Sequence, residues 1–185
     1  DCLLSRGLGD VYKRQFDHQI ELEAQLEAKG KTEILAAMNA ELARPGEMSF
    51  TRQMQPKGLG HAVWCARDII GHEPFAVVLP DVIVDGKPGA LKQLVEVYAE
   101  TGGNLIGVES VDIEQAHRYG IVDPAAREGN RIAMKGMVEK PAPGTAPSNL
   151  SIAGRYILQP EIFDLLATQE PVSYTHLTLP TKRIV

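Results

Sequence analysis

The sequence predicts an α/β domain in which helices flank a mixed β-sheet. Residues 75–79 (FAVVL) are apolar without alternation, which is typical of a strand that is covered on both faces. Strand-like and helix-like segments alternate from 48 to 109, which favours strands joined by right-handed parallel crossovers. Beyond Tyr119 the strand-like segments lack long helices between them, which indicates an antiparallel or mixed extension of the sheet.

The first elements expected along the chain are two helices and a short strand. Residues 21–29 are charged and helix-favouring, and Gly30 separates them from a second helical stretch. The apolar residues of that stretch have the spacing of one buried stripe: Ile34, Leu35, Met38 and Leu42. The Pro45–Gly46 pair ends it, and residues 48–53 are predicted to form a short strand.

A turn with glycines at 58 and 60 then leads into a helix that runs to about residue 70. Glycine lets the backbone approach a ligand closely. A lone Gly-x-Gly is more often an ordinary loop, however, and Lys57 beside it would usually be a solvated surface charge. The turn is therefore only one part of a possible site.

Asp81 follows the apolar strand directly, because Pro80 cannot donate a ladder hydrogen bond and should end that strand. Ligands of open α/β sheets bind outside the carboxyl ends of the strands. A carboxylate there can hold a hard cation such as Mg²⁺, which in turn holds phosphate oxygens. The alternative is an ordinary aspartate that caps the next turn.

The remaining elements complete the sheet. Residues 90–101 have the pattern of an amphipathic helix that Gly102 and Gly103 end, and residues 104–109 resemble a second buried strand. Further strands are expected at 119–123, 132–140 and 149–158. Pro160 opens a last short helix at 161–167.

Composition narrows the class of protein. A length of 185 residues suits about one domain, and a net charge of −5 without basic blocks argues against nucleic acid or an anionic membrane as a partner. The sequence has no bilayer-spanning apolar run, no signal peptide and only two cysteines, which predicts a cytoplasmic protein. The histidines lack metal-ligand spacing, so a zinc site is not expected.

Both ends differ in character from the rest of the chain. Residues 1–15 (DCLLSRGLGDVYKRQ) show neither helical nor strand periodicity and resemble translated sequencing-adapter sequence, as do residues 172–185 (VSYTHLTLPTKRIV). We therefore expect both ends to be non-native and the evolved domain to cover 16–171. A pair of genuine tails is the alternative.

Five groups of residues, in this order, resemble one family. They are K-G-L-G-H-A at 57–62, L-P-D-V at 79–82, Y-G at 119–120, E-K-P at 139–141, and S-N-L at 148–150 with G-R-Y at 154–156. Together they resemble the bacterial UTP–glucose-1-phosphate uridylyltransferases over about residues 16–171. The resemblance implies a Rossmann-like, glycosyltransferase-A-like nucleotidyltransferase domain, truncated at both ends. It also implies the reaction of UTP with glucose 1-phosphate to give UDP-glucose and pyrophosphate.

The resemblance assigns three residues to the nucleotide. Gln53 and Gly58 would contact the uracil, with Gln53 able to donate and accept hydrogen bonds. Asp81 would hold Mg²⁺ between the nucleotide phosphates. Positioning and charge neutralisation, rather than covalent chemistry, would supply most of the catalysis.

Four further residues would face the sugar phosphate. Gly120 would let the backbone meet the glucose, Glu139 would accept hydrogen bonds from sugar hydroxyls, and Lys140 would meet the phosphate, acting with Asp81 in catalysis. Ile152 would pack near the sugar. Each has a structural alternative: a β-bulge at Gly120, an exposed Glu139–Lys140 ion pair, and plain core at Ile152.

Parts of the family pattern are missing. The triphosphate loop, G-x-G-T-R-x-L-P-x-T-K, would precede this chain, and a later metal-sharing Asp and phosphate-binding Lys would follow Pro171. We therefore expect the chain as written to bind nucleotide poorly and to lack useful turnover. The oligomeric state stays open, with a homo-oligomer possible for a full-length protein.

Three rival functions remain. A thymidylyltransferase acting on the same sugar phosphate is the nearest, and 19–42 with 57–61 favours the uridylyl family over it. A Rossmann dehydrogenase needs G-x-G-x-x-G, and the third glycine position is Val63. A non-catalytic nucleotide-binding module is the third.

Overall fold

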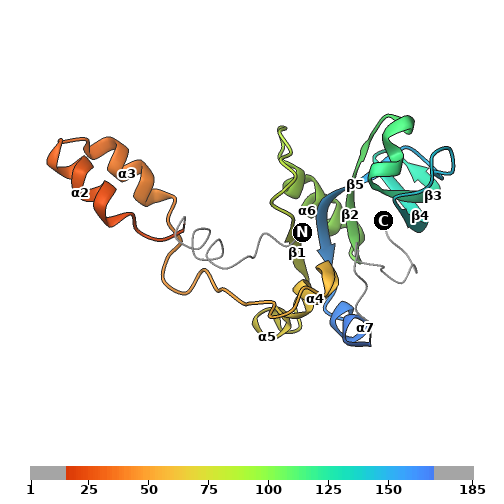
Figure 1. Ribbon diagram of the computed structural model, residues 1–185, viewed down its shortest axis with the longest axis horizontal. Helices are drawn as coiled ribbons and strands as arrows, with labels where there is room; N and C mark the ends of the chain where they lie inside the picture. The colour runs from red at the N-terminus through yellow and green to blue at the C-terminus, as the bar shows by residue number, and fades with distance from the viewer. Residues whose placement is uncertain (1–15, 169–185) are drawn as a thin grey trace. The chain divides into compact units, whose positions relative to one another are not determined.

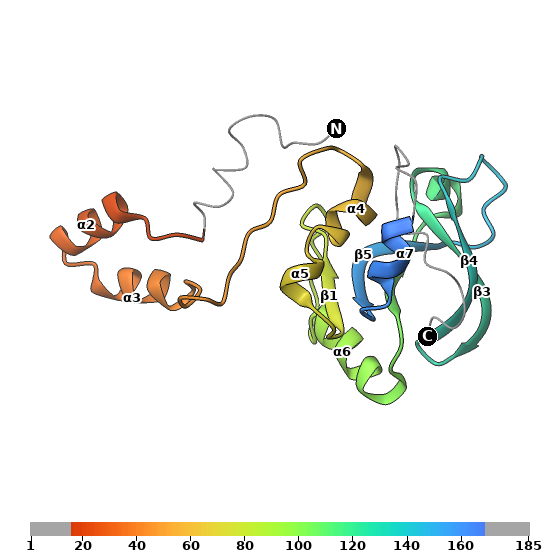
Figure 2. The ribbon, with the colours of Figure 1, turned by 90° about the horizontal axis from the view of Figure 1, so that it is seen from below.

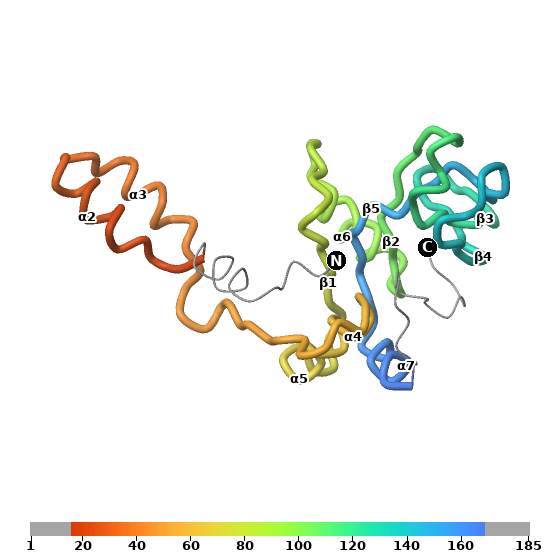
Figure 3. Tube along the Cα trace, viewed as in Figure 1, coloured from red at the N-terminus to blue at the C-terminus, as the bar shows by residue number. Residues whose placement is uncertain are grey.

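The computed structural model describes residues 16–168, and the chain divides into two compact units, residues 1–51 and 52–185. Figures 1 and 3 show the course of the chain through both units. The end segments expected to be non-native, 1–15 and 172–185, lie outside the described residues. Within 16–168, no helix is both long and apolar enough to cross a membrane.

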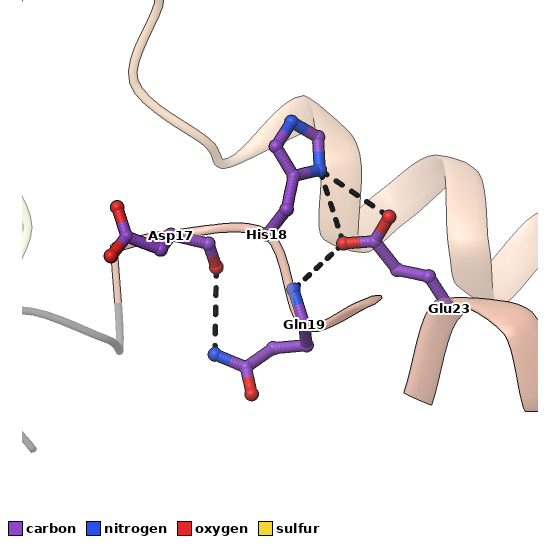
Figure 4. A network of polar contacts seen from close by, with 4 residues as sticks. All are labelled: Asp17, His18, Gln19 and Glu23. Carbon is purple, nitrogen blue, oxygen red and sulfur yellow. Dashed lines mark hydrogen bonds and ion pairs between the residues drawn. The ribbon is translucent and has the colours of Figure 1, made fainter. Parts of the chain in front are cut away.

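The described part of the first unit is a pair of short helices, as predicted. They are α2 (Ile20–Ala28) and α3 (Thr32–Ala40), and Gly30, at φ +65°, lies in the turn between them. The Glu23 carboxylate accepts from the Gln19 backbone N–H at 2.8 Å and lies 3.1 Å from His18 Nδ1 (Figure 4). The negative charge of Glu23, in the first turn of α2, also interacts favourably with the helix dipole.

The predicted buried stripe on α3 is only partly correct. Leu35, Met38 and Leu42 are half-buried, but the Ile34 side chain is 49% exposed. The physical reason is that, among the described residues of this unit, α2 is the element against which α3 packs, so one narrow strip of the helix is covered. Leu26 of α2, at 9% exposed, is the buried apolar residue of this helix pair.

The predicted strand at 48–53 is wrong. These residues have no regular secondary structure, and Met48 and Phe50 are 39% and 51% exposed. No described strand pairs with them, and an extended segment without a neighbour gains no ladder hydrogen bonds.

The second unit is an α/β domain with a five-stranded sheet, which confirms the predicted fold class. Its strands are β1 (Phe75–Val78), β2 (Leu105–Ser110), β3 (Gly120–Glu128), β4 (Arg131–Glu139) and β5 (Leu150–Leu158). The 3₁₀ helix η1 (Ile113–Arg118), which the sequence did not predict, leads into β3. Figure 2 shows β3 and β4 as a long curved two-stranded ribbon.

Strand β5 is the centre of the sheet. It pairs with β2 along one edge; along the other it pairs with β1 at 155–158 and with β3 at Ser151. β1 and β2 run in the same direction and are joined through α6 (Ala90–Thr101) (Figure 1). They do not pair with each other, because β5 lies between them. Every ladder among the described strands is therefore antiparallel. This arrangement agrees with the mainly apolar sequence of β5 (LSIAGRYIL), whose residues are buried except for the half-buried Leu150 and Arg155.

The prediction that residues 75–79 are covered on both faces is wrong. Phe75 and Val77 are half-buried, and the Phe75 ring stacks on Phe163 at 5.0 Å, but Ala76 is exposed and Val78 is 48% exposed. β1 pairs with β5 alone among the described strands, and only one of its faces meets the core.

Helices pack against the sheet and against one another around the hydrophobic core. α6 packs on β2 and β5, and α4 (Gly58–Trp64) packs on α7 (Ile162–Thr168) (Figure 2). The helix predicted to run to about residue 70 is interrupted, because the chain restarts as α5 (Arg67–Ile70). The buried residues of the core cluster come from helices α4 and α7 and from strands β2 to β5. They are Val63, Ile106, Val122, Met134, Ile152, Tyr156, Leu158, Ile162, Phe163 and Leu166.

Candidate functional site

The structure brings the two residues expected to contact a base next to each other. Gln53 is half-buried, and its Nε2 donates to the Gly58 carbonyl oxygen at 3.0 Å. The same Nε2 lies 2.9 Å from Nδ1 of His61, one turn into α4. Gly58 has φ +85°, a conformation that glycine adopts without a Cβ clash.

Asp81 lies in a turn at the end of β1 that β5 holds in place. The Leu79 N–H donates to the Gly154 carbonyl oxygen at 2.9 Å. The Arg155 guanidinium donates to the carbonyl oxygens of Leu79, at 2.9 Å, and of Val82, on either side of Asp81. Both ends of the turn are thus fixed to one strand, and the Asp81 side chain is exposed beyond them.

Gly120 and Glu139 face each other across the β3–β4 ladder. Gly120 is buried, Glu139 is half-buried, and the Lys140 N–H extends the ladder by donating to Tyr119 O at 3.0 Å. The structure therefore places three of the four residues assigned to the sugar phosphate at one end of this hairpin.

Lys140 has an unusual backbone. Its φ is +44°, and among residues 16–168 it is the one non-glycine residue with positive φ. The left-handed region costs a residue with a Cβ about 1–2 kcal/mol, and a residue before proline, here Pro141, ordinarily prefers extended backbone. Strain of this kind persists where the surroundings impose it, often at functional sites.

Tyr156 connects the Asp81 turn with the Glu139 hairpin. Its side chain is fully buried in β5, and burial, followed by the charges of Glu139 and then Asp81, raises its pKa to about 12. Both carboxylates are therefore close enough to destabilise the same phenolate. Residues that the sequence separates widely lie around one buried hydroxyl.

Two hydroxyls in β5 are buried without a hydrogen-bond partner among the described residues. They are Tyr156 Oη and Ser151 Oγ. Such groups are rare in native interiors because an unmet hydroxyl loses its bonds to water. Ser151 lies between Glu109 of β2 and Ile121 of β3 in the sheet.

Ile152 does not join this group. It is 8% exposed, pairs with Val108 of β2 and belongs to the hydrophobic core cluster. The position thus favours the structural alternative, plain core packing, over contact with a sugar.

Sequence reasoning did not assign roles to Arg155, His61 or Tyr156. A signal for Arg155 was present, since it is a charged residue in an otherwise apolar strand (LSIAGRYIL). The contact of His61 with Gln53 and the electrostatic influence of Glu139 and Asp81 on Tyr156 depend on tertiary packing, and no local pattern indicates them.

The described residues contain no cluster of three or more His, Cys, Asp or Glu side chains that could hold a metal ion. Asp81 supplies a single exposed carboxylate. Mg²⁺ is commonly bound through one or two carboxylates together with substrate phosphates and water. The donor set therefore fits Mg²⁺ that arrives with a nucleotide, and it does not form an all-protein metal cage.

A cavity of about 310 Å³ lies between α6, β2, β5 and the β3–β4 hairpin, and Arg155, which holds the Asp81 turn, is part of its lining. Its lining is mainly apolar and includes none of the residues predicted to form the site. The candidate site residues therefore lie outside this cavity, in the turn after β1 and at the end of β4, on either side of β5 and β3 in the strand order.

Comparison with known proteins supports one family. A family model described as nucleotidyl transferase matches residues 12–180. A UTP--glucose-1-phosphate uridylyltransferase from Bacillus subtilis (strain 168) is 52% identical over 155 residues, which is 84% of this chain and 53% of that protein. The chain thus spans about half the length of the curated relatives it matches.

Solved structures resemble the fold. A UDP-glucose pyrophosphorylase from Acinetobacter baumannii has a TM-score of 0.78 and 40% identity, covering 91% of this chain and 60% of that chain. A UTP-bound enzyme from the same organism has a TM-score of 0.74 and 43% identity, covering 84% and 56%. Because the family model extends over more than half of the sequence, this chain belongs to the nucleotidyl transferase family.

Proposed function

We propose that the protein represented by this chain transfers the uridylyl group of UTP to glucose 1-phosphate, releasing pyrophosphate and forming UDP-glucose. An oxygen of the sugar phosphate would attack the α-phosphorus of UTP, and pyrophosphate would leave. The names of the relatives and of the similar solved structures support this reaction. We also propose that residues 16–171 are the part of the nucleotidyltransferase domain present here, with non-native sequence at 1–15 and 172–185.

The base would bind where Gln53 and Gly58 meet. Their mutual hydrogen bond fixes the Gln53 side chain beside the turn backbone. An ordered amide loses less conformational entropy on binding than a free one, which supports its use in recognising a base.

The sugar phosphate would bind at the end of the β3–β4 hairpin. The Glu139 carboxylate would accept hydrogen bonds from sugar hydroxyls, and the missing side chain at Gly120 would let the backbone approach the ring. Lys140 would place its ammonium on the phosphate. Its side-chain direction depends on the φ of +44° at this position, which supports a functional reason for the strain.

Asp81 would hold Mg²⁺ against the nucleotide phosphates. A divalent ion held by Asp81 would supply positive charge to the phosphate oxygens. The role of this chain is to keep the carboxylate in place, and the hydrogen bonds from Arg155 to Leu79 and Val82 support that role.

The observation that carries this proposal is how the sheet fixes the candidate residues: Arg155 of β5 holds the turn that carries Asp81, and the β3–β4 ladder sets Glu139 opposite Gly120. The raised pKa of Tyr156, next to Arg155, agrees with this, because both carboxylates contribute to it after burial. A cation-binding carboxylate and a sugar-binding carboxylate must be neighbours if both serve one transfer reaction. No such requirement applies to two unrelated surface residues.

A chimera tests the proposal. Residues 16–168 replace the matching segment of the Bacillus subtilis relative, and pyrophosphate release is measured with UTP and glucose 1-phosphate. We expect turnover, and an Asp81→Asn version should lose about a hundredfold or more, as when a charge-stabilising group is removed. Asp85→Asn, an exposed neighbour, is the control. A folded chimera without turnover, or one indifferent to Asp81→Asn, would overturn the proposal.

Competition between UTP and dTTP in the same assay separates a uridylyltransferase from a thymidylyltransferase. We propose UTP as the preferred substrate, a cytoplasmic location and no nucleic-acid or membrane partner. A homo-oligomer is proposed for a full-length protein, and light scattering of the chimera would test it.

A further inference from the structure

The Gln53 amide is oriented by the chain itself. Its Nε2 carries two hydrogens, and the two acceptors in reach are the Gly58 carbonyl oxygen at 3.0 Å and His61 Nδ1 at 2.9 Å. A carbonyl oxygen can only accept. A flipped amide would therefore set Oε1 of Gln53 against Gly58 O, with two acceptors in contact, so the orientation follows from the chemistry of the partners.

His61 must present an acceptor to complete this arrangement. Because Nε2 of Gln53 only donates, Nδ1 of His61 is unprotonated and its proton is on Nε2. The imidazole is also held in place: it stacks on the Trp64 ring, with centroids 5.8 Å apart and planes at 27°. Arg67 covers that indole at 3.7 Å and donates to Trp64 O at 3.2 Å.

We propose that His61 is a positioning residue that determines which base the site accepts. With both amide hydrogens taken within the chain, the group that Gln53 offers to a ligand is its carbonyl oxygen, Oε1. The site would then select a pyrimidine that presents a ring N–H donor between two carbonyls, and would reject one with a ring acceptor at that position. The inference rests on the proposed function, because it deepens the base-binding role of Gln53.

Uracil and cytosine differ in this respect. N3 of uracil carries a hydrogen that Oε1 can accept, whereas N3 of cytosine is an acceptor that would face Oε1 without a hydrogen between them. A mismatched pair of this kind loses the hydrogen bond and leaves buried polar groups unmet, which corresponds to about tenfold or more in affinity. Without His61, Gly58 O would still hold one Nε2 hydrogen, but the second hydrogen would have no acceptor in the chain. It could then donate to N3 of cytosine, which would remove most of the preference.

The first measurement uses the 185-residue chain without ligand. Long-range ¹H–¹⁵N spectra report which nitrogen of His61 is protonated. We expect the proton on Nε2, with Nδ1 as an acceptor. A dominant Nδ1–H form would overturn the inference, because that nitrogen could not accept from Gln53.

The second measurement compares UMP and CMP by NMR titration of the chimera up to millimolar concentration, following the signals of Gln53 and Gly58, because the chain as written is expected to bind nucleotide poorly. We expect UMP to bind about tenfold or more tightly than CMP. His61→Phe keeps a ring to stack on Trp64 and removes both nitrogens, so the preference should fall to about twofold or less by the same relation. His72→Phe, the same change at an exposed histidine, should leave it intact.

A third variant guards against a folding defect in His61→Phe. His61→Asn retains an acceptor oxygen on a shorter side chain and should keep part of the UMP preference. A preference that survives unchanged in folded His61→Phe would overturn the inference and leave the proposed function standing. Binding of neither nucleotide by a folded chimera with the expected tautomer would overturn the proposed base site itself, and the inference with it.

Discussion

Gly154→Ala is expected to destabilise the second unit by about 2–3 kcal/mol, for two separable reasons. Gly154 has φ +63°, where a residue with a Cβ is strained by about 1–2 kcal/mol. A Cβ at this position would also lie 3.2 Å from Cβ and 3.3 Å from Cδ1 of Leu79, closer than ordinary contact. Relief of that contact requires Leu79 to move, an overpacking cost of about 1 kcal/mol.

Gly129→Ala is the matched control. Gly129 has φ +62°, almost the same backbone strain, and a Cβ there would meet no atom within 4 Å. The control should therefore show the conformational cost alone, about 1–2 kcal/mol. The difference between the two variants isolates the contact with Leu79, the residue whose N–H donates to Gly154 O just before the Asp81 turn.

Urea unfolding followed by tryptophan fluorescence measures both variants. The chain has a single tryptophan, Trp64, and it lies in the same unit as both glycines. We expect Gly154→Ala to lose about 1 kcal/mol more than Gly129→Ala, with unchanged denaturant dependence. Equal losses would refute the packing of Leu79 against Gly154 and, with it, the described position of the Asp81 turn.

Three other predictions concern the same site. Between pH 10 and 12, Tyr156 should lower the unfolding free energy by about 1.4 kcal/mol per pH unit. The reason is that the folded protein keeps the hydroxyl proton, whereas the unfolded chain, in which the pKa is 10.0, loses it. Urea unfolding at each pH measures the decline, and Tyr156→Phe should lack this part of it. Lys140→Gly should raise stability by about 0.5–1 kcal/mol in urea, since it relieves the positive φ, and should lower turnover of the chimera. Arg155→Met should cost about 2 kcal/mol by the same unfolding assay, because the carbonyls of Leu79 and Val82 lose a charged donor.

Much of the fold follows from local patterns in the sequence. The apolar spacing of residues 90–101 predicted α6 at its observed bounds, and the strand expected at 149–158 differs from β5 by one residue. The wrong predictions share a physical cause. Residues 48–53 have strand-like composition, and residues 75–79 have the composition of a doubly covered strand, but pairing and burial depend on which neighbours the chain supplies.

The candidate site could be predicted in part. The motifs identified Gln53 with Gly58, and Gly120 with Glu139, and each pair lies together in the structure. The left-handed backbone of Lys140 could not be read from a Glu-Lys-Pro triplet, whose proline favours the opposite conformation.

The supporting residues of the site were beyond prediction. The Arg155 hydrogen bonds to the Asp81 turn arise from the register of β1 against β5, two strands far apart in the sequence. Likewise, Glu139 and Asp81 influence the pKa of Tyr156 only once β1, β4 and β5 have assembled into the sheet. Long-range register of this kind is a property of the packed sheet, and residue composition near each position carries no signal for it.

The most direct test of the site is the pKa of the Tyr156 hydroxyl in three proteins. Tyrosine labelled with ¹³C at Cζ would report it by NMR in the original chain, in Asp81→Asn and in Glu139→Gln. The original chain should give a pKa of about 12, and each substitution should lower it, with the larger drop for Glu139→Gln. An unchanged pKa in both variants would mean that the two carboxylates do not share a neighbourhood, and the proposed site would be contradicted.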